Sequence, residues 1–341
     1  MNFQNLTRIE TPDTYLDIAF SKAKKTVGKV REKTKLREGA KEARLEKSKK
    51  IETERISTIR NILYDRLNEI LTSYPSIDRL PIFYRELVKC TLDYAALKKS
   101  LGAVNWAAKK VNEFFRLYQS KIAKTRDLEK VNQYRREFYG RISSVVKRIK
   151  EELAYLEESR KVMKDYPAVK TSAKTAAIMG FPNVGKTTLL YKLTGSKPEI
   201  KSYAFTTKNI NISYIETKDK KIQLLDTPGT LNRFNKMNNI EKQAYLALEY
   251  CADLIVYVFD ITEPFPLKEQ EELLRNLKEF KKEVIIYLSK ADILEKEKTN
   301  EFKKKHKESI TKPEELKQNL FLPFLKINCS CRECYVYSRL S

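Results

Sequence analysis

The sequence predicts an α/β P-loop domain, with a mostly parallel sheet flanked by helices, preceded by an all-α antiparallel helical bundle. Residues 180–187 match the pattern G-x-x-x-x-G-K-[ST] between a short apolar run and a segment with helical spacing. Residues 51–165 contain few glycines and repeat apolar residues at helical spacing. A chain of 341 residues with 41% hydrophobic content can build two cores. We therefore expect two domains, at 1–168 and 169–341.

The helical domain is predicted from where helices start, stop and carry apolar stripes. Thr11 followed by Pro12 is typical of a helix N-terminus, and Pro75 and Pro81 interrupt the segments that follow. The predicted core stripes are Ile51, Ile56, Ile59, Ile62 and Leu63; Phe114, Phe115, Leu117 and Tyr118; and Ile142, Val145, Val146, Ile149, Leu153 and Leu156. Because no carboxylate pair, Ser/His pair or metal-ligand cluster occurs there, we expect this domain to bind and not to catalyse.

Positive charge is concentrated in the N-terminal half of the chain. The net charge is +23, and residues 22–50 alone carry 13 basic and 4 acidic side chains. This basic arm repels itself, and nucleic acid is its natural partner through salt-dependent phosphate contacts. The alternative is a solvated helix face in a lysine-rich chain. The candidate RNA-binding residues are Lys24, Lys25, Lys29, Arg31, Lys33, Lys35, Arg37, Lys41, Arg44, Lys47, Lys49 and Lys50.

The segment 180–187 is predicted to hold the phosphates of a nucleotide. Its two glycines let the backbone wrap around an anion, so that several N–H groups and the helix N-terminus point at the phosphates. Lys186 is expected to reach the β- and γ-phosphates, and the Thr187 hydroxyl to ligate Mg²⁺. The candidate nucleotide-binding residues here are Gly180, Phe181, Pro182, Asn183, Val184, Gly185, Lys186, Thr187 and Thr188.

Two later segments are predicted to respond to the γ-phosphate. A strand over 220–225 runs into residues 226–229, where Asp226 suits a Mg²⁺ site and the Gly229 N–H suits the γ-phosphate; a plain turn is the alternative. In residues 203–208 we favour Thr207 over Thr206 as a Mg²⁺ ligand of the triphosphate state, although spacing does not separate them. The predicted catalytic residues are Lys186, Thr207 and Gly229, the predicted Mg²⁺ ligands are Thr187, Thr207 and Asp226, and Asp226, Thr227, Pro228 and Gly229 join the nucleotide-binding set.

The base is predicted to be guanine, which makes the second domain a P-loop GTPase domain. Apolar strands over 254–260 and 284–288 lead to Ser289, Lys290 and Asp292, where guanine-nucleotide proteins usually carry Asn-Lys-x-Asp. An Asp here accepts from guanine N1–H and the exocyclic amine, which adenine cannot supply. Serine in place of asparagine replaces the amide only in part. A strand over 324–326 followed by Asn328 and Cys329 is the candidate fifth nucleotide-binding element, near a C-terminal end that is short for this fold.

Composition favours a soluble, intracellular protein, which we expect to be a monomer. No apolar run is long enough to span a bilayer, and residues 1–4 lack the apolar stretch of a leader. Five cysteines, an odd number, argue against a disulfide framework and for a reducing compartment. Three of them cluster at 329–334, but without the two separated pairs of a typical zinc site.

With these motifs assembled, the chain resembles the nucleolar GTP-binding protein 1 family, within the Obg-like translation-factor-related GTPases. The resemblance rests on residues 180–187, 203–208 and 226–229, and on the basic helical domain that precedes them, including 75–78 and 81–84. It implies a GTPase that assembles the large ribosomal subunit with other assembly factors, its bundle gripping ribosomal RNA. It also implies an archaeal, cytoplasmic member, or a nucleolar one in a eukaryote.

The resemblance also bears on the rate of hydrolysis. Thr230 stands where Ras-like proteins carry a water-orienting glutamine, so slow hydrolysis of GTP to GDP without a ribosomal partner is expected. Asn183 is similar to an asparagine that in some related GTPases helps to bind K⁺; a plain loop residue is the alternative. Two other functions stay open at this point: action on translation or tRNA, and a nucleotide-binding scaffold with very slow hydrolysis.

Overall fold

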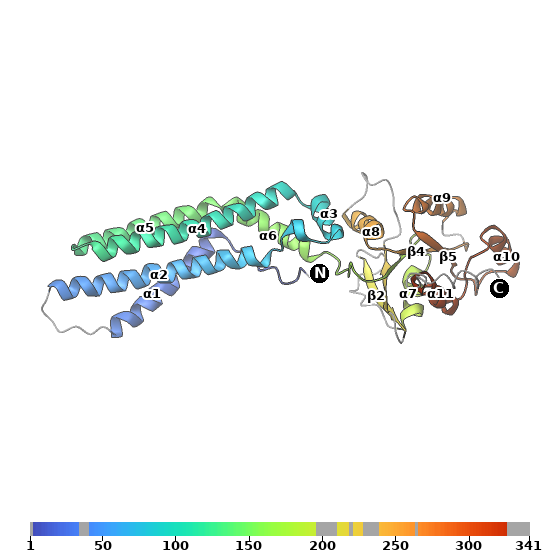
Figure 1. Ribbon diagram of the computed structural model, residues 1–341, viewed down its shortest axis with the longest axis horizontal. Coiled ribbons are helices and arrows are strands. Elements are labelled where there is room, and N and C mark those ends of the chain that lie inside the picture. Colours follow the sequence, from blue (N-terminus) through green and yellow to red (C-terminus); the bar gives the residue numbers. More distant parts are fainter. Residues whose placement is uncertain are drawn as a thin grey trace, which may run out of the picture. The chain divides into compact units, whose positions relative to one another are not determined.

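The computed structural model describes residues 3–33, 41–195, 210–217, 221–227, 239–262 and 265–325. Contacts divide the chain into two compact units (Figure 1). The bundle unit comprises residues 2–79 and 91–166, and the sheet unit comprises residues 80–90 and everything from 167 onward. The predicted combination of an all-α bundle with an α/β P-loop domain is confirmed.

The bundle unit is built from long helices that pack side by side. They are α1 (Pro12–Lys33), α2 (Lys41–Ser73), α4 (Tyr94–Lys124), α5 (Leu128–Arg148) and α6 (Lys150–Lys164), with a 3-10 turn at Ile77–Arg79. Asp93 and Asp127 cap α4 and α5 by accepting the backbone N–H groups of Ala96 and Glu129 at 2.9 and 2.8 Å. Helix α2 packs against α1, α4 and α5, and α4 packs against α5 and α6.

Apart from the half-buried Ile62, the predicted core stripes are buried in α2 and in α5–α6, whereas only Tyr118 of the predicted α4 stripe is buried. Leu117 is 45% exposed, and Phe114 and Phe115 are only half-buried. Tyr118 shares the buried face of α4 with Leu97, Val104, Ala107, Ala108, Val111 and Ile122. The buried face passes through Ala107 and Ala108, and Phe114 and Phe115 lie at its margin.

Helix α3 (Ile82–Thr91) is short and lies almost entirely in the sheet unit, although the sequence analysis counted these residues with the bundle. Its residues Phe83, Tyr84, Leu87 and Val88 are fully buried. The Tyr84 hydroxyl bonds to the carbonyl oxygens of Pro167 and Val169, each at 2.9 Å. The chain thus leaves the bundle at residue 79, contributes a helix to the other unit and returns at residue 91.

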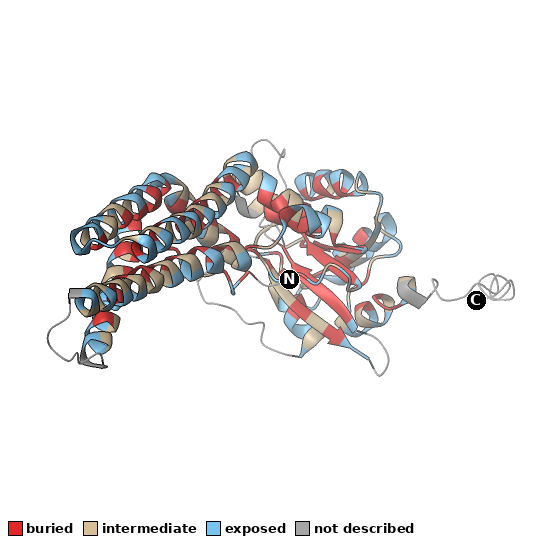
Figure 2. Cartoon of the chain, turned by 60° about the vertical axis from the view of Figure 1, so that its left-hand side comes forward, coloured by how far each residue is buried: buried red, intermediate tan, exposed pale blue. Residues whose placement is uncertain are grey.

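The sheet unit has five strands in the order β2-β3-β1-β4-β5, all parallel except β2. They are β1 (Thr175–Met179), β2 (Asn211–Glu216), β3 (Lys221–Asp226), β4 (Leu254–Phe259) and β5 (Glu283–Leu288). Strands β1 and β4 are buried along their whole length (Figure 2). This accounts for their continuous apolar sequence.

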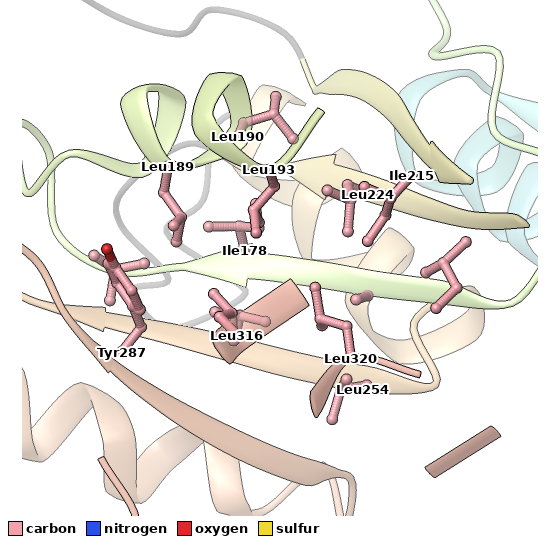
Figure 3. Packing of buried hydrophobic residues seen from close by; sticks show 14 of the residues in the cluster. Ile178, Leu189, Leu190, Leu193, Ile215, Leu224, Leu254, Tyr287, Leu316 and Leu320 are labelled. Carbon is pink, nitrogen blue, oxygen red and sulfur yellow. The ribbon is translucent and has the colours of Figure 1, made fainter. Parts of the chain in front are cut away.

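Helices cover both faces of this sheet. They are α7 (Lys186–Thr194), α8 (Asn239–Tyr250), α9 (Leu267–Lys278), α10 (Lys296–Lys305), α11 (Pro313–Asn319) and α12 (Leu322–Leu325). On one face, Leu189 and Leu193 of α7 and Leu316 of α11 pack against Ile178 and Leu224 of the strands (Figure 3). On the other, residues of α8, α9 and α10 pack against β4 and β5. The C-terminal ends of the parallel strands lie at one shared edge of the sheet, which the helices on its two faces leave accessible to a ligand through the connecting loops.

The strand predicted over 324–326 is wrong for its described residues, because Leu322–Leu325 is helical. Pro323 fixes a φ angle that suits the first turn of a helix. The strand was predicted because the residues around it are apolar, a property that a short buried helix shares. The sheet is extended instead by Ile310, whose N–H donates to the Ile286 carbonyl at 2.9 Å and whose carbonyl accepts the Leu288 N–H at 2.8 Å. The candidate residues Asn328 and Cys329 lie outside the described residues.

Candidate nucleotide-binding site

The loop between β1 and α7 has the backbone of a phosphate cradle. Gly180, Asn183 and Gly185 have φ angles of 146°, 62° and 95°, and two of the three positions are glycine. A Cβ atom at Gly180 would lie 2.6 Å from the Val258 carbonyl oxygen, so no other residue fits this close approach of the loop to β4. A loop of this backbone, leading directly into the N-terminus of α7, is suited to turn successive N–H groups toward a bound anion.

Lys186 opens α7 and its side chain is buried beneath this loop. It is 6% exposed, and its Nζ donates to the carbonyl oxygens of Gly180 at 2.9 Å and Phe181 at 2.7 Å. Burial lowers the pKa of Lys186 to about 8, against a smaller raising effect of the Asp226 carboxylate. The cation is therefore held next to the cradle, in a medium that strengthens its attraction for a phosphate.

The lowered pKa predicts a pH dependence of nucleotide affinity. A free-state pKa of about 8 means that Lys186 loses its proton as the pH rises from 7 to 9, whereas a bound phosphate favours the charged form. We expect the Kd for GTP to rise about tenfold over this interval. Fluorescence titration with a labelled GTP measures it, and the Lys186→Met variant is the control, since it keeps any titration of the guanine ring. An equal rise in both proteins would contradict the assignment.

Thr187 and Asp226 form the second part of the site. The Thr187 hydroxyl donates to Asp226 Oδ2 at 2.8 Å, and the Asn211 amide donates to the same oxygen at 3.3 Å. Asp226 is buried, and its other oxygen, Oδ1, has no hydrogen-bond partner among the described residues. Burial raises the pKa of Asp226, with the Thr187 bond acting in the opposite direction. A buried carboxylate oxygen without a partner, beside a hydroxyl, is the donor set that a hard divalent cation such as Mg²⁺ takes.

The three residues predicted to read the base fall at the end of β5, next to the cradle. Asp292 is exposed and free to meet a ligand, whereas Ser289 is buried. The Ser289 hydroxyl donates to the Phe259 carbonyl at 2.8 Å, and its Cβ would lie 3.7 Å from a Cβ at Gly185. Ser289 therefore joins the ends of β4 and β5 to the cradle. Lys290 has a φ of 53° and forms an ion pair with Asp260 at 2.5 Å.

Other predicted residues take varied positions. Thr227 is buried and its hydroxyl donates to the Ile178 carbonyl at 2.9 Å, which ties the end of β3 to β1. Val184 is part of the core, Phe181 and Pro182 are half-buried, and Asn183 and Thr188 are exposed. The predicted residues Thr206, Thr207, Pro228, Gly229, Thr230, Lys35 and Arg37, and the side chains of Lys33 and Lys41, lie outside the described part of the chain.

Sequence reasoning missed two buried polar residues, Asp260 and Gln270, both 0% exposed. They lie beside the base-reading loop, by which we mean residues 289–292. A signal was present for each. Asp260 ends an apolar strand at the sheet edge where ligands bind. Gln270 stands with Leu273, Leu274 and Leu277 at the spacing of the buried face of α9.

The described residues of the basic arm are mostly solvent-facing. Lys24, Lys25, Lys29 and Arg31 on α1 are exposed, as are Arg44 and Lys50 on α2, while Lys47 and Lys49 are half-buried and Lys49 pairs with Glu46. In the part of the chain that the structure describes, no helix is long and apolar enough to cross a membrane, and no three His, Cys, Asp or Glu side chains gather as a metal site would require.

Comparison with known proteins assigns both units. Residues 3–170 match the family model described as the NOG1 N-terminal helical domain, and residues 175–290 match that of a 50S ribosome-binding GTPase. An uncharacterized protein of the archaeon Methanocaldococcus jannaschii is 36% identical, over 86% of this chain and 82% of that protein.

Two eukaryotic relatives carry the name nucleolar GTP-binding protein 1. The Kluyveromyces lactis protein is 31% identical over 71% of this chain and 38% of its own length, and the Drosophila melanogaster protein is 29% identical over 86% and 44%. The chain thus spans about two fifths of the length of these relatives. With a NOG1 helical domain, a P-loop GTPase domain and these relatives, the chain belongs to the nucleolar GTP-binding protein 1 family.

Proposed function

We propose that the chain hydrolyses GTP to GDP and phosphate and acts as an assembly factor of the large ribosomal subunit, with the bundle binding ribosomal RNA. The observation that carries the enzymatic part is the group formed by Lys186, Thr187 and Asp226 under a left-handed cradle loop. The family membership and the name of the matched GTPase model support the ribosomal part.

The residues divide the chemistry between them. Backbone N–H groups of residues 180–187 and the Lys186 cation hold the phosphates and stabilise the charge that develops as water attacks the γ-phosphate in line. Thr187 and Asp226, with Thr207, are the proposed ligands of Mg²⁺, which when bound neutralises charge on the β- and γ-phosphates. No side chain acts as a nucleophile, so the rate of GTP hydrolysis depends on how well the attacking water is positioned. We therefore expect hydrolysis to be slow in the absence of a ribosomal partner. Asn183 is the proposed K⁺ ligand.

The preference for guanine is tested by replacing Asp292, the carboxylate that is proposed to bind the edge of the base. The change Asp292→Asn replaces an acceptor by a group that can donate to the extra oxygen of xanthine. We expect preference to move from GTP toward xanthosine triphosphate, with a loss of about 10²-fold or more in GTP affinity, as when a buried polar partner is mismatched. Competition of both nucleotides against a labelled GTP measures the change. GTP binding that survives intact would show that another residue reads the base.

The RNA-binding surface extends beyond the basic arm to the turn between α4 and α5. Arg60 of α2 bonds to Asn112 of α4, and Glu52 of α2 pairs with Arg135 of α5 at 3.4 Å. Because α2 runs antiparallel to α4, these contacts place the first turns of α2 beside the α4–α5 turn (Figure 1). The arm and this turn therefore share one end of the bundle.

The α4–α5 turn is itself strongly basic, with seven basic and two acidic side chains in residues 116–136. Its exposed cations, none of which forms a side-chain hydrogen bond or ion pair with another described residue, are Arg116, Lys124, Arg126, Lys130 and Arg136. Lys121 lies over the rings of Tyr118 and Tyr134, at 5.1 and 5.3 Å from their centroids. Together with Arg44 and Lys50, these charges suit a phosphate backbone.

A charge series tests this surface. Changing the five exposed cations of the turn to glutamine is expected to reduce the magnitude of the slope of log K against log salt by about 2 to 4, since each lost phosphate contact removes roughly 0.7 to 0.9. The measurement is fluorescence anisotropy with labelled ribosomal RNA fragments. The matched control changes five exposed lysines of the sheet unit, Lys268, Lys278, Lys281, Lys303 and Lys304. An unchanged slope in the first variant, or an equal drop in both, would exclude a specific role of the turn.

The assembly role is tested by co-sedimentation of the full chain with isolated large-subunit precursors, mature ribosomes and tRNA. We expect retention on the precursors that depends on GTP, together with faster single-turnover GTP hydrolysis on the bound particle. Retention on mature ribosomes or tRNA instead would favour action in translation. Binding of GTP without stimulated hydrolysis under any of these conditions, with and without K⁺, would favour a nucleotide-binding scaffold.

A further inference from the structure

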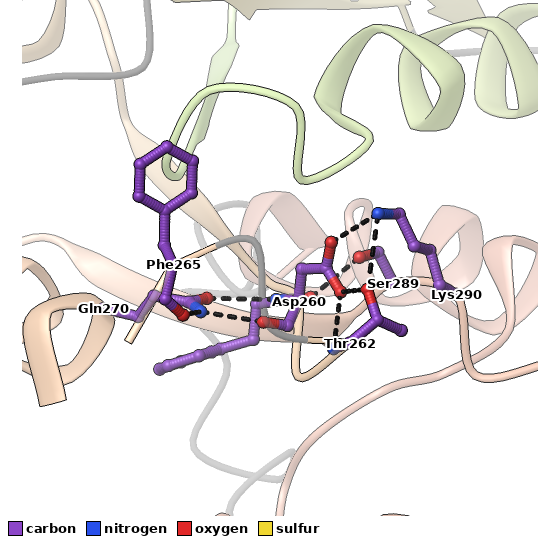
Figure 4. A network of polar contacts seen from close by, with 7 residues as sticks. Asp260, Thr262, Phe265, Gln270, Ser289 and Lys290 are labelled. Atoms are coloured by element: carbon purple, nitrogen blue, oxygen red, sulfur yellow. Dashed lines mark hydrogen bonds and ion pairs between the residues drawn. The ribbon is translucent and has the colours of Figure 1, made fainter. Parts of the chain in front are cut away.

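Gln270 of α9 is a fully buried amide that uses all of its hydrogen bonds on one loop (Figure 4). Its Oε1 accepts the Asp260 N–H at 3.0 Å, and its Nε2 donates to the carbonyl oxygens of Asp260 at 2.7 Å and Phe265 at 3.1 Å. A buried amide satisfied in this way fixes the backbone on which it acts. The same loop carries Phe265, whose ring lies 5.0 Å from that of Phe181 in the phosphate cradle.

The fixed backbone aims the Asp260 carboxylate at the base-reading loop. Its Oδ1 accepts the N–H and the hydroxyl of Thr262 at 2.9 and 2.6 Å, and its Oδ2 accepts Lys290 Nζ at 2.5 Å. Asp260 is 0% exposed, while the Lys290 side chain is 35% exposed. A buried carboxylate thus holds the ammonium group of a lysine whose side chain is only partly buried. The backbone of Lys290 has a φ of 53°, which is uncommon for a residue with a side chain.

We propose that Asp260 is a positioning residue for the base: held by Gln270, it fixes Lys290 so that the lysine stem forms one wall of the guanine site. This rests on the proposed function, since it assumes that guanine binds here. Neither Asp260 nor Gln270 touches the base. Their effect passes through Lys290, and it concerns the flat face of the purine and not the edge that Asp292 reads.

Nucleotides whose bases differ only at the edge that Asp292 reads should therefore respond equally to a change at Asp260. In Asp260→Asn, a neutral group of the same shape replaces the partner of Lys290. We expect about a tenfold rise in Kd for GTP and an equal rise for inosine triphosphate, which lacks the exocyclic amine, because the wall is lost for both. Asp253→Asn is the matched control, since Asp253 precedes the other end of β4 and accepts the Thr175 N–H at 2.9 Å.

A double-mutant cycle decides whether Asp260 acts through Lys290. In the Lys290→Ala background, Asp260→Asn is expected to change the Kd for GTP by less than about twofold, because the group that it positions is gone. A full tenfold loss in that background would overturn the proposal, as would an unchanged Kd in the single variant. Thermal unfolding of each variant, and Gln270→Met as a second route to the same loss, separate positioning from misfolding. If the unaltered chain does not bind GTP at all, the proposed function fails instead.

Discussion

Replacing Lys186 by methionine is expected to reduce single-turnover hydrolysis of GTP by about 10²- to 10³-fold, the usual cost of losing one preorganised group that stabilises transition-state charge. Methionine has a similar length, so it fills the buried space beneath the cradle without carrying charge. The lost cation sits within 2.9 Å of two cradle carbonyls and acts in a water-poor setting, where its attraction for phosphate is strong. Rapid-quench measurement of phosphate release at saturating GTP gives the rate.

The control for this variant is a lysine in the same helix that faces solvent. Lys192 lies in the last turn of α7, is exposed, and has no role in the cradle. Lys192→Met should therefore hydrolyse GTP at the unaltered rate, and both variants should bind RNA with the same salt dependence as the original chain. A Lys186→Met protein that retains more than about a tenth of the original rate would remove Lys186 from the catalytic role.

The second large effect is on stability, at Tyr84. Changing Tyr84 to alanine is expected to destabilise the sheet unit by about 3 to 5 kcal/mol, the cost of removing a fully buried aromatic ring. The hydroxyl bonds to Pro167 and Val169 are lost as well, so α3 loses its link to the segment that leads into β1. Release of a bound fluorescent GDP during urea titration reports the sheet unit, and the single tryptophan, Trp106 of α4, reports the bundle.

Two variants separate the parts of this effect. Tyr84→Phe keeps the ring and should cost only about 0.5 to 1.5 kcal/mol, the usual value of a hydrogen bond. Tyr74→Ala removes a comparable buried ring from the bundle, where its hydroxyl donates to the Leu156 carbonyl at 2.6 Å, and should shift the Trp106 transition instead. If Tyr84→Ala lowers the Trp106 midpoint and leaves nucleotide release unchanged, α3 belongs energetically to the bundle.

Elements with a strong local signal were predictable from the sequence. The cradle needs glycine at two left-handed positions, and β4 is an uninterrupted apolar run because helices cover both of its faces. Both requirements can be recognised in runs of consecutive residues. The first and last core stripes of the bundle were equally clear, since every third or fourth residue of α2 and of α5–α6 must be apolar to meet a neighbour.

Elements that depend on distant partners were not predictable in the same way. The apolar spacing of α3 shows that one face is buried but does not say against which unit. Leu117 fits a stripe in the sequence and yet is 45% exposed, because the helices that pack against α4 decide which of its faces is buried. The positions of Asp260 and Gln270 in the sequence indicate a strand end and a buried helix face, but that the two side chains meet follows only from the packing of α9 against β4. The basic α4–α5 turn likewise comes to lie beside the arm only through the packing of α2.

Because α3 belongs to the sheet unit but lies between two helices of the bundle in sequence, the sheet unit is encoded by two separate stretches of the gene. Within the residues that the structure describes, the backbone passes between the units three times, at residues 79–80, 90–91 and 166–167. A polypeptide that starts at residue 169 therefore lacks a buried helix of its own fold and exposes the apolar surface that Phe83, Tyr84 and Leu87 cover. Cutting the chain once at 166–167 leaves α3 attached to the wrong fragment. Exchanging one unit for a homologous module therefore requires three splice points, all within the first half of the coding sequence.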